Sequence, residues 1–255
     1  MPSGPAPGAD LPFDVAVTGA RLSYGGRALF DGLSLTLEAG RWTCLLGPSG
    51  VGKTTLLRLV AGLAAPEPPT RVAASDGRPI AGRVAWMAQQ DLLLPWLCVL
   101  DNVMLGARLR GGPRDAGCRA RALELLARVG LADRAADRPA ALSGGMRQRA
   151  ALARTLMEDR PLVLMDEPFS ALDAITRLRL QEEAARHLAG RTVLLVTHDP
   201  LEALRLGDRV LVMAGSPATL SEVPAPPGAP PRAPDDPALL AAQAALLRRL
   251  AGDAA

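Results

Sequence analysis

The run from Gly47 to Thr54 carries the residue types of a phosphate-binding loop. It reads Gly-Pro-Ser-Gly-Val-Gly-Lys-Thr, and Lys53 is the single lysine among 29 basic residues. Backbone N–H groups of a glycine-rich loop that opens a helix bind phosphate oxygens, and a slim ammonium fits beside phosphate where the wide fork of arginine does not. In the pattern G-x-x-x-x-G-K-[ST], Lys53 neutralises the outer phosphates and Thr54 ligates Mg²⁺. The nucleotide-binding residues predicted in this run are Gly47, Pro48, Ser49, Gly50, Val51, Gly52, Lys53, Thr54 and Thr55.

Two carboxylates follow an apolar run further along the chain. Leu162 to Met165 reads as a buried strand, and Asp166 and Glu167 come directly after it. Ligands of parallel sheets bind at the carboxyl ends of the strands, so both acids are expected at a ligand site. We predict that Asp166 completes the Mg²⁺ shell and that Glu167 polarises the attacking water, which in phosphoryl transfer is mostly a positioning task. The alternative for Glu167 is a solvated loop acid.

A second helix start with anion-binding residues lies between these two motifs. Leu142 to Arg149 reads Leu-Ser-Gly-Gly-Met-Arg-Gln-Arg, a turn that leads directly into a helical pattern. The hydroxyl of Ser143 and the amides of Gly144 and Gly145 are predicted to form a second anion site. A single γ-phosphate seldom needs both sites from the same subunit.

His198 is one of two histidines in the chain, and a lone histidine is usually packed or solvated. It follows the apolar run Thr192–Val196, which is predicted to deliver it to the sheet edge that also carries Glu167. An imidazole at that edge can bridge the γ-phosphate and the attacking water. We therefore predict a catalytic role for His198.

Tyr24 and Asn102 each occur once in the sequence. Tyr24 precedes Gly25-Gly26 in a predicted turn, an exposed setting where a ring can stack on a base, although the ring could equally fill the core. Asn102 follows Asp101 at the start of a helical segment, so an N-cap role is predicted for it rather than chemistry.

The hydrophobic patterns around these motifs predict the elements that position them. Alternating residues favour an antiparallel β portion near the N-terminus, and short continuous apolar runs favour buried parallel strands. The predicted strands are Val15–Leu22, Leu33–Leu37, Trp42–Leu46, Arg83–Met87, Pro161–Met165, Thr192–Val196 and Val210–Met213. The predicted helices are Lys53–Ala61, Arg119–Val129, Arg147–Met157, Arg177–Leu188 and Ala238–Leu250. The strand and helix alternation that resumes after a helical middle third predicts an α/β fold with a parallel sheet.

Composition excludes several classes of protein. The net charge of +3 comes from 29 basic and 26 acidic residues spread along the chain, which does not resemble a nucleic-acid footprint. Three cysteines without paired or metal-like spacing favour reduced thiols in a cytosolic protein. No apolar stretch is long enough to span a membrane, and the first ten residues have no signal-peptide pattern, so we expect a chain that is neither exported nor membrane-spanning.

Taken together, these motifs resemble the nucleotide-binding subunit of an ATP-binding cassette (ABC) transporter over roughly residues 14–215. The order of the motifs makes the resemblance specific, although Ala88 stands where the family often has Phe. The matching residues are Gly47–Thr54 (phosphate loop), Gln89 (Q-loop), Leu142–Arg149 (signature), Asp166–Glu167 (second acidic motif), Ser170–Asp173 (D-loop), His198 (switch histidine) and Tyr24 (adenine-stacking ring).

The resemblance implies a fold and a set of site residues. The expected fold is that of a P-loop NTPase with a RecA-like parallel-sheet core, an antiparallel β subdomain and a helical subdomain at about residues 90–158. The cassette is expected over residues 13–215, after a flexible leader at 1–12 and before a Pro-rich linker and short helix at 216–255. Gln89 is expected to act in catalysis and at the metal, and Asp173 at the nucleotide. Two copies are expected to close head to tail on two ATP, so that the signature of one chain caps the ATP on the phosphate loop of the other.

The resemblance also implies partners. An ABC ATPase of this size is expected at the cytoplasmic face of the cell membrane, peripherally attached to transmembrane permease subunits, with an extracytoplasmic substrate-binding protein and no nucleic acid. The segment Leu92–Leu97 is unusually apolar for a loop, and it is either a docking surface for the membrane subunit or a buried joint. The stretch Met87–Leu97 and the tail rich in Pro and Arg resemble importer ATPases of the nitrate, sulfonate and taurine group, most of all those proposed to import the hydroxymethylpyrimidine precursor of thiamin.

Two other classes of protein share the phosphate loop. A soluble ABC protein that acts as a clamp in DNA repair or translation would need a long coiled-coil insertion or two cassettes in tandem, and neither is present. In a phosphate-loop kinase, no function would be expected for Leu142–Arg149, Ser170–Asp173 and His198.

Overall fold

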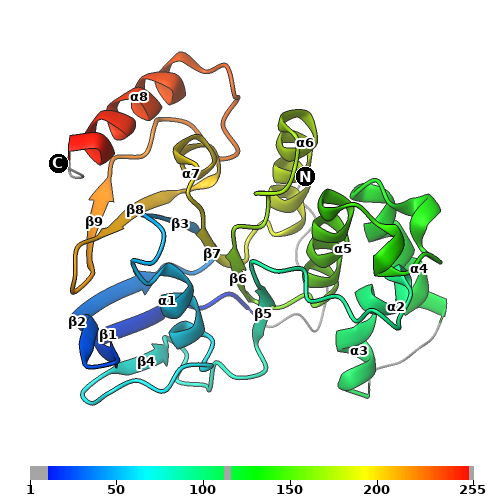
Figure 1. Cartoon of the computed structure of the whole chain (residues 1–255), viewed down its shortest axis with the longest axis horizontal. Coiled ribbons are helices and arrows are strands. Elements are labelled where there is room, and N and C mark those ends of the chain that lie inside the picture. The colour runs from blue at the N-terminus through cyan, green and yellow to red at the C-terminus, as the bar shows by residue number, and fades with distance from the viewer. Residues whose placement is uncertain (1–10, 112–115, 253–255) are drawn as a thin grey trace. The chain divides into compact units, whose positions relative to one another are not determined.

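A computed structural model describes residues 11–111 and 116–252 of the chain and divides them into two compact units (Figure 1). The described residues of unit 1 are 85–111, 116–160 and 168–188, and those of unit 2 are 11–84, 161–167 and 189–252. The predicted leader at 1–12 lies outside the described residues except for its last two positions.

Five strands of a six-stranded sheet lie wholly within unit 2. Its order is β5-β6-β7-β3-β8-β9, and the pairs β6 with β7, β7 with β3 and β3 with β8 are parallel. Every residue of β3, β6 and β7 is buried, which is why these strands read as continuous apolar runs rather than alternating ones. The chain passes from unit 2 to unit 1 within β5. The strands are β3 (Trp42–Leu46), β5 (Val84–Met87), β6 (Leu162–Asp166), β7 (Thr192–Val196), β8 (Arg209–Ala214) and the antiparallel β9 (Thr219–Val223).

A second sheet of unit 2 is antiparallel, with the order β2-β1-β4. Strands β1 (Val15–Tyr24) and β2 (Arg27–Leu37) form a hairpin, and β1 also pairs with β4 (Arg71–Ala74). The two-residue turn Gly25-Gly26 has φ angles of 57° and 78°, the left-handed region that such a tight hairpin requires. This turn fixes the end of β1, where Tyr24 lies.

The helices divide between the two units. Unit 1 is mostly helical, and Figure 1 shows its helices in green and yellow-green. They are α2 (Val99–Val103), α3 (Leu105–Leu109), α4 (Ala116–Arg128), α5 (Gly144–Met157) and α6 (Ala174–His187), with 3₁₀ turns at Ala132–Arg134 and Pro139–Ala141. Unit 2 holds α1 (Lys53–Val60), α7 (Pro200–Leu206) and α8 (Pro237–Gly252). No helix among the described residues is both long and apolar enough to cross a membrane.

The predicted parallel strands and the α/β class are confirmed, and the main differences lie in short elements. Strands β4 and β9 were not predicted, because both lie in stretches rich in proline and glycine whose residues alternate over only four or five positions. Helix α7 was also missed, since its seven residues are too few to establish a helical period.

The N-cap role predicted for Asn102 is wrong. Asn102 is fully buried inside α2, whose N-cap is Cys98. The Asn102 side chain accepts a hydrogen bond from the Leu94 N–H and donates to the carbonyls of Leu94, Leu97 and Cys98. It therefore holds the loop that precedes the helix rather than the helix start itself.

The C-terminal segment is bound to α7 by one buried arginine. Nη1 of Arg232 donates to the carbonyl oxygens of Leu204 and Gly207 at 2.7 and 2.9 Å, and Nε donates to Pro226 O at 3.0 Å. The Arg232 N–H also donates to Arg205 O. The carbonyls of Leu204, Arg205 and Gly207 lie at the C-terminal end of α7, where a positive charge is favourable. Helix α8 packs against α7, so this segment is part of unit 2.

We predict that Arg232→Ala lowers the free energy of unfolding by about 2–4 kcal/mol, because it leaves several buried carbonyls without donors. Arg248→Ala, which removes an exposed arginine of α8, serves as the control and is expected to change stability by no more than about 0.5 kcal/mol. Urea unfolding of both variants measures this difference. Equal stability of the two variants would show that Arg232 does not anchor the tail.

Candidate functional site

The carboxyl edge of the parallel sheet brings together three of the predicted motifs. Strand β3 runs into the loop that starts at Gly47, β6 ends in Asp166, and β7, which lies between them, leads to His198. Neighbouring strands lie about 4.8 Å apart, so β3 and β6 are separated by about 10 Å at this edge. Residues far apart in the sequence thus reach one place because their strands are parallel.

The loop after β3 has backbone groups that are free to bind an anion. A Cβ at Gly47 would lie 2.4 Å from the carbonyl oxygen of Met213, so only glycine fits there. Helix α1 begins after Gly52, which has a φ of 113°, and no side chain caps this helix start. The first N–H groups of a helix have no partner within the helix, so here they are available to phosphate oxygens. Thr55 lies in this first turn.

Lys53 is buried against its own loop. Its Nζ donates to the carbonyl oxygens of Gly47 and Pro48 at 2.7 and 2.9 Å. Burial lowers the pKa of Lys53 below its ordinary value, and the negative charges of Glu167 and Asp166 oppose that shift. The ammonium is therefore held at the loop in the position predicted for a phosphate ligand.

Thr54 and Asp166 form a pair of oxygen ligands. The Thr54 hydroxyl donates to Oδ2 of Asp166 at 2.6 Å, and Asp166 is 3% exposed. Burial raises the pKa of the Asp166 carboxyl, and the hydrogen bond from Thr54 opposes the shift. Two hard oxygens fit Mg²⁺, which is commonly held by one or two protein oxygens together with phosphate and water oxygens. No cluster of three or more His, Cys, Asp or Glu suited to a metal occurs in the described part of the chain.

Glu167 and His198 meet beside this pair. Nδ1 of His198 lies 3.2 Å from Oε1 of Glu167, and the imidazole is 62% exposed whereas the carboxylate side chain is 17% exposed. Glu167 has a φ of 49°, an uncommon conformation for a residue with a side chain, and its N–H donates to Val196 O at the end of β7. Backbone strain of this kind is often found at functional sites.

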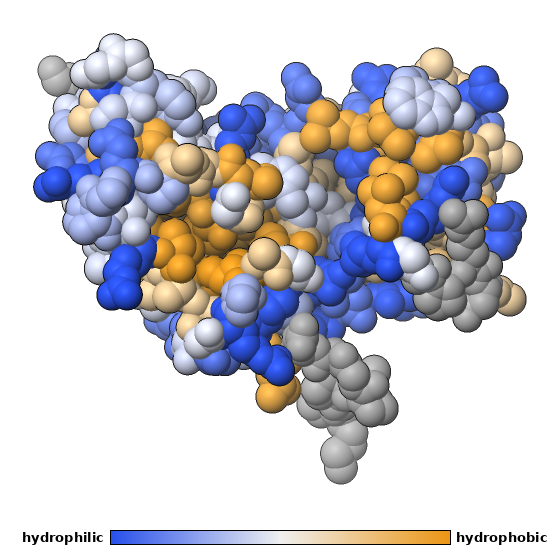
Figure 2. Space-filling model, turned by 90° about the horizontal axis from the view of Figure 1, so that it is seen from below, coloured by the Kyte–Doolittle hydropathy of each residue, from blue (hydrophilic) through white to orange (hydrophobic). Residues whose placement is uncertain are grey.

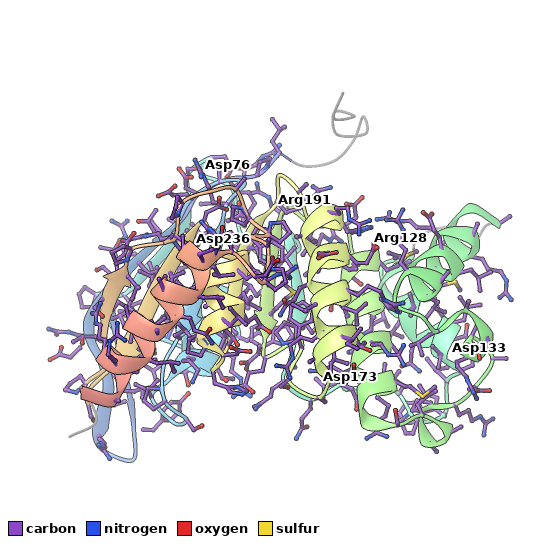
Figure 3. All side chains as sticks on the ribbon, turned by 90° about the horizontal axis from the view of Figure 1, so that it is seen from above. Asp76, Arg128, Asp133, Asp173, Arg191 and Asp236 are labelled. Atoms are coloured by element: carbon purple, nitrogen blue, oxygen red, sulfur yellow. The ribbon has the colours of Figure 1, made fainter. Side chains whose placement is uncertain are left out.

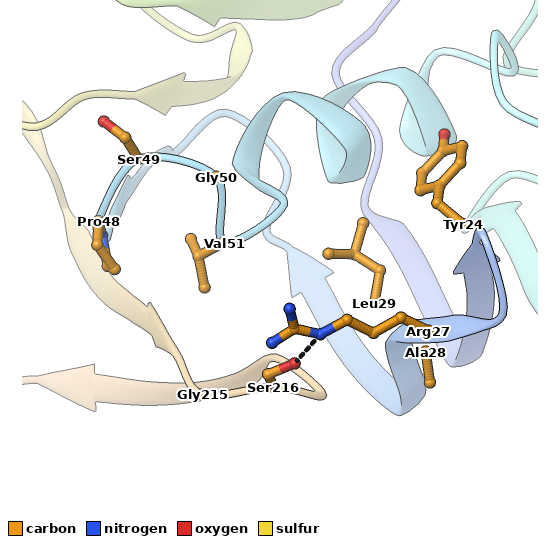
Figure 4. Close-up of a pocket in the computed structure, with 10 residues that line it drawn as sticks. All are labelled: Tyr24, Arg27, Ala28, Leu29, Pro48, Ser49, Gly50, Val51, Gly215 and Ser216. Carbon is orange, nitrogen blue, oxygen red and sulfur yellow. Dashed lines mark hydrogen bonds between the residues drawn. The ribbon is translucent and has the colours of Figure 1, made fainter.

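Tyr24 lines a pocket next to the phosphate loop. The pocket has a volume of about 560 Å³, and its walls include Tyr24 and Arg27 of the β1–β2 hairpin and the loop residues Pro48 to Val51, which Figure 4 shows at opposite sides of the view. Tyr24 is 58% exposed, so the alternative that it fills the core is wrong. The remaining lining residues are Ala28, Leu29, Gly215 and Ser216.

The signature residues Ser143, Gly144 and Gly145 open helix α5 in unit 1. The hydroxyl of Ser143 is the N-cap and accepts a hydrogen bond from the Met146 N–H at 3.3 Å. A Cβ on Gly145 would lie 3.0 Å from the carbonyl oxygen of Ala171, so the D-loop approaches this helix start closely. The predicted Ser-Gly-Gly turn before a helix is confirmed as a local structure.

Gln89 lines a second pocket, which lies within unit 1. This pocket has a volume of about 420 Å³, and its walls also include Gly144 of the signature and Ser170 of the D-loop. The Q-loop, signature and D-loop of the chain therefore meet around one pocket. Asp173 caps helix α6, whose start Figure 3 marks, by accepting a hydrogen bond from the Thr176 N–H, and this bond lowers the pKa of Asp173.

Helix α5 connects these three loops through contacts that the sequence did not predict. Nε of Arg147 donates to Oδ2 of Asp91 at 3.0 Å, and Arg154 donates to the backbone carbonyls of Asp91 and Leu92. Gln148 bonds to Ser170 and to the Ala171 N–H. The seven-residue spacing of Arg147 and Arg154 along a helix was the one available signal, and it is too weak to identify a partner.

The apolar segment Leu92–Leu97 is partly exposed. Leu93 is buried, whereas Leu92 and Trp96 are 56% and 67% exposed. Figure 2 shows apolar side chains, in orange, reaching the surface of the part of the chain that holds the helices of unit 1, at the right of the view. A wholly buried joint is therefore excluded for this segment.

The predicted site residues thus fall into two groups. Unit 2 brings together Tyr24, the residues from Gly47 to Thr55, Asp166, Glu167 and His198, whereas Gln89, Ser143, Gly144, Gly145 and Asp173 belong to unit 1.

Comparison with known proteins identifies the family. Residues 30–170 match the family described as "ABC transporter". An ABC transporter ATP-binding protein of Haemophilus influenzae is 45% identical over 94% of this chain and 99% of its own length. The aliphatic sulfonates import ATP-binding protein SsuB of Delftia acidovorans is 46% identical over 94% of this chain and 95% of its own length.

Solved structures give the same result. The dimeric bacterial ABC transporter cassette MJ0796 is 29% identical, with a TM-score of 0.69 over 78% of this chain and 93% of that one. The same cassette in a dimeric post-hydrolysis state with ADP and phosphate has a TM-score of 0.72 at 28% identity, over 86% of this chain and 99% of that one. The protein therefore belongs to the ATP-binding subunits of ABC transporters and is an ATP hydrolase.

Proposed function

We propose that ATP is cleaved at the carboxyl edge of the parallel sheet, on the phosphate loop of unit 2. The observation that carries this proposal is the convergence of Lys53, Thr54, Asp166 and Glu167 at the ends of neighbouring strands. Lys53 and the uncapped amides of α1 supply positive charge and donors, which is what a triphosphate needs. The exposed ring of Tyr24 supplies a face on which adenine stacks.

The residues of the edge have separate roles in the reaction. The carboxylate of Glu167 accepts a proton from the attacking water, whose oxygen bonds to the γ-phosphorus while ADP leaves. His198, 3.2 Å from Glu167, holds the water and the γ-phosphate in line. Thr54, Asp166 and Gln89 would hold Mg²⁺, which neutralises charge on the phosphates. Gln89 also takes part in placing the water.

The second group of residues acts on the nucleotide of a second copy. Ser143, Gly144 and Gly145 lie at a helix start, which favours an anion, and Asp173 begins the neighbouring helix of the same unit. In the homodimer that we propose, these residues of one chain close over the triphosphate held by Lys53 of the other. Two-fold symmetry then gives two ATP per dimer. The dimeric cassettes among the structural relatives support this arrangement.

The dimer drives import through separate permease subunits at the cytoplasmic face of the membrane, and an extracytoplasmic protein delivers the solute. The exposed side chains of Leu92 and Trp96 form the docking surface for the permease. Several relatives carry the name aliphatic sulfonates import ATP-binding protein, so we propose an alkanesulfonate as the solute, with taurine and nitrate as close alternatives. No reported relative supports the hydroxymethylpyrimidine expected from the sequence.

Glu167→Gln is predicted to lower kcat for ATP hydrolysis by about 10²–10⁴-fold, because the amide cannot accept the proton from water. The Kd for ATP is expected to stay within about threefold of the native value. Glu182→Gln, an exposed change on α6, is the matched control and should hydrolyse ATP normally. Turnover by Glu167→Gln at the native rate would refute the assigned base.

Asp166→Asn is predicted to stabilise the nucleotide-free protein at neutral pH. Burial raises the folded-state pKa of Asp166, so the charged form costs stability, at about 1.4 kcal/mol for each pKa unit. The stability gained by the substitution should reach its full size above the raised pKa of Asp166 in the folded state. It should vanish as the pH falls below the ordinary pKa of 3.8, where the carboxyl group of the native protein is neutral as well. Unfolding by urea across this pH range measures it. A destabilised variant at neutral pH would contradict the buried-charge account.

The transport proposal predicts that the chain co-purifies with permease subunits when expressed with its neighbouring genes. The associated binding protein is then screened by thermal shift against alkanesulfonates, taurine, nitrate and hydroxymethylpyrimidine. Stabilisation by an alkanesulfonate is the expected result. Stabilisation by hydroxymethylpyrimidine alone would overturn the sulfonate assignment, and recovery without any permease would overturn the transport role.

A further inference from the structure

The pocket beside the phosphate loop contains a charged side chain with no assigned role. Of the residues that line it, Arg27 alone carries a charge. Its Nε donates to the hydroxyl of Ser216 at 3.1 Å, and Figure 4 shows the guanidinium reaching from β2 across the pocket to this residue of the β8–β9 turn. Within the described residues, no hydrogen bond or ion pair engages the two terminal amino groups of Arg27.

Arg27 lies on the side of the phosphate loop where the nucleoside end of a bound nucleotide is expected. The pocket is continuous with Pro48 to Val51, so whatever projects from a triphosphate on this loop enters the space that Tyr24 and Arg27 flank. A volume of about 560 Å³ is within the usual range for small-molecule sites. Lys53 and the backbone N–H groups of α1 are already placed to bind the phosphates. The sugar and the base are therefore the parts of the nucleotide that Arg27 can contact.

The chemistry of a guanidinium limits what Arg27 can recognise. It has five N–H donors and no acceptor, so it binds acceptor atoms such as the ring nitrogens N3 and N7 of a purine or the hydroxyl oxygens of ribose. Adenine and guanine share these atoms. The hydrogen bond to Ser216 holds the guanidinium in place before the ligand arrives, which reduces the side-chain conformational entropy lost on binding.

We propose that Arg27 is a nucleoside-binding residue, which donates hydrogen bonds to the purine or ribose of the bound nucleotide opposite Tyr24, and that Ser216 positions it. This inference depends on the proposed binding of ATP at Lys53. It predicts that Arg27 strengthens the binding of purine nucleoside triphosphates and contributes nothing to the binding of a bare polyphosphate.

The test compares the Kd values for Mg·ATP, Mg·GTP, 2′-deoxy-ATP and Mg·tripolyphosphate by calorimetry. Arg27→Met keeps the length of the side chain without its donors and is expected to weaken ATP and GTP by about tenfold each, with tripolyphosphate unchanged. Arg21→Met removes the same charge from an exposed arginine of β1 that does not line the pocket, and it should bind all four ligands normally. If 2′-deoxy-ATP also loses tenfold, the donors reach the base or the 3′-hydroxyl, and if it loses nothing, they reach the 2′-hydroxyl; both results support the proposal.

Two results would overturn it. One is an Arg27→Met Kd for ATP within twofold of the native value, which would make the bond to Ser216 a surface contact only. The other is an equal loss for tripolyphosphate, which would reflect general charge. Ser216→Ala should cost less than Arg27→Met and nothing further in the double variant, because Ser216 acts through Arg27. Lys53→Ala distinguishes a failure of the Arg27 proposal from a failure of the proposed ATP site. It must weaken the binding of both ATP and tripolyphosphate, and if it weakens neither, the proposed ATP site is wrong.

Discussion

The parallel pairing of β3, β7 and β6 is the constraint on which the rest of the structure depends. Because these strands run in one direction, residues as distant in sequence as Lys53, Asp166 and His198 reach the same sheet edge. Their continuous apolar sequences bury both faces of the sheet, and this burial fixes the strand ends. The proposed chemistry requires nothing more of the core than this rigid placement.

In the absence of a ligand, several residues at this sheet edge lower the stability of the folded protein. Asp166 is a buried carboxylate whose pKa is raised, Lys53 is an ammonium whose pKa burial lowers, and Glu167 has a strained backbone that costs about 1–3 kcal/mol. The two buried charges favour a bound cation beside Asp166 and a bound anion beside Lys53. The site is thus prepared for a charged ligand at the expense of stability, as sites of phosphoryl transfer commonly are.

The sequence predicted those parts of the fold where local pattern and tertiary structure agree. The bounds of β3 and β7 follow directly from their apolar runs. Most of the predicted site residues were chosen because they follow a strand or open a helix, whereas Gln89 and Asp173 came from the family resemblance. The pattern could not reveal contacts that depend on a side chain far away in sequence. Asn102 holds a loop instead of capping a helix, Arg232 binds the end of α7, and Arg27 meets Ser216 across 189 positions.

We propose that the two groups of site residues complete each other across two copies of the chain. Mixing two inactive variants, Lys53→Ala and Ser143→Arg, tests it most directly through their ATP hydrolysis. If each site combines Lys53 of one copy with Ser143 of the other, the mixture should recover about a quarter of native activity, since half of the dimers contain one intact site of two. If the mixture stays as inactive as either variant alone, while mixed dimers are shown to form, the shared site is contradicted.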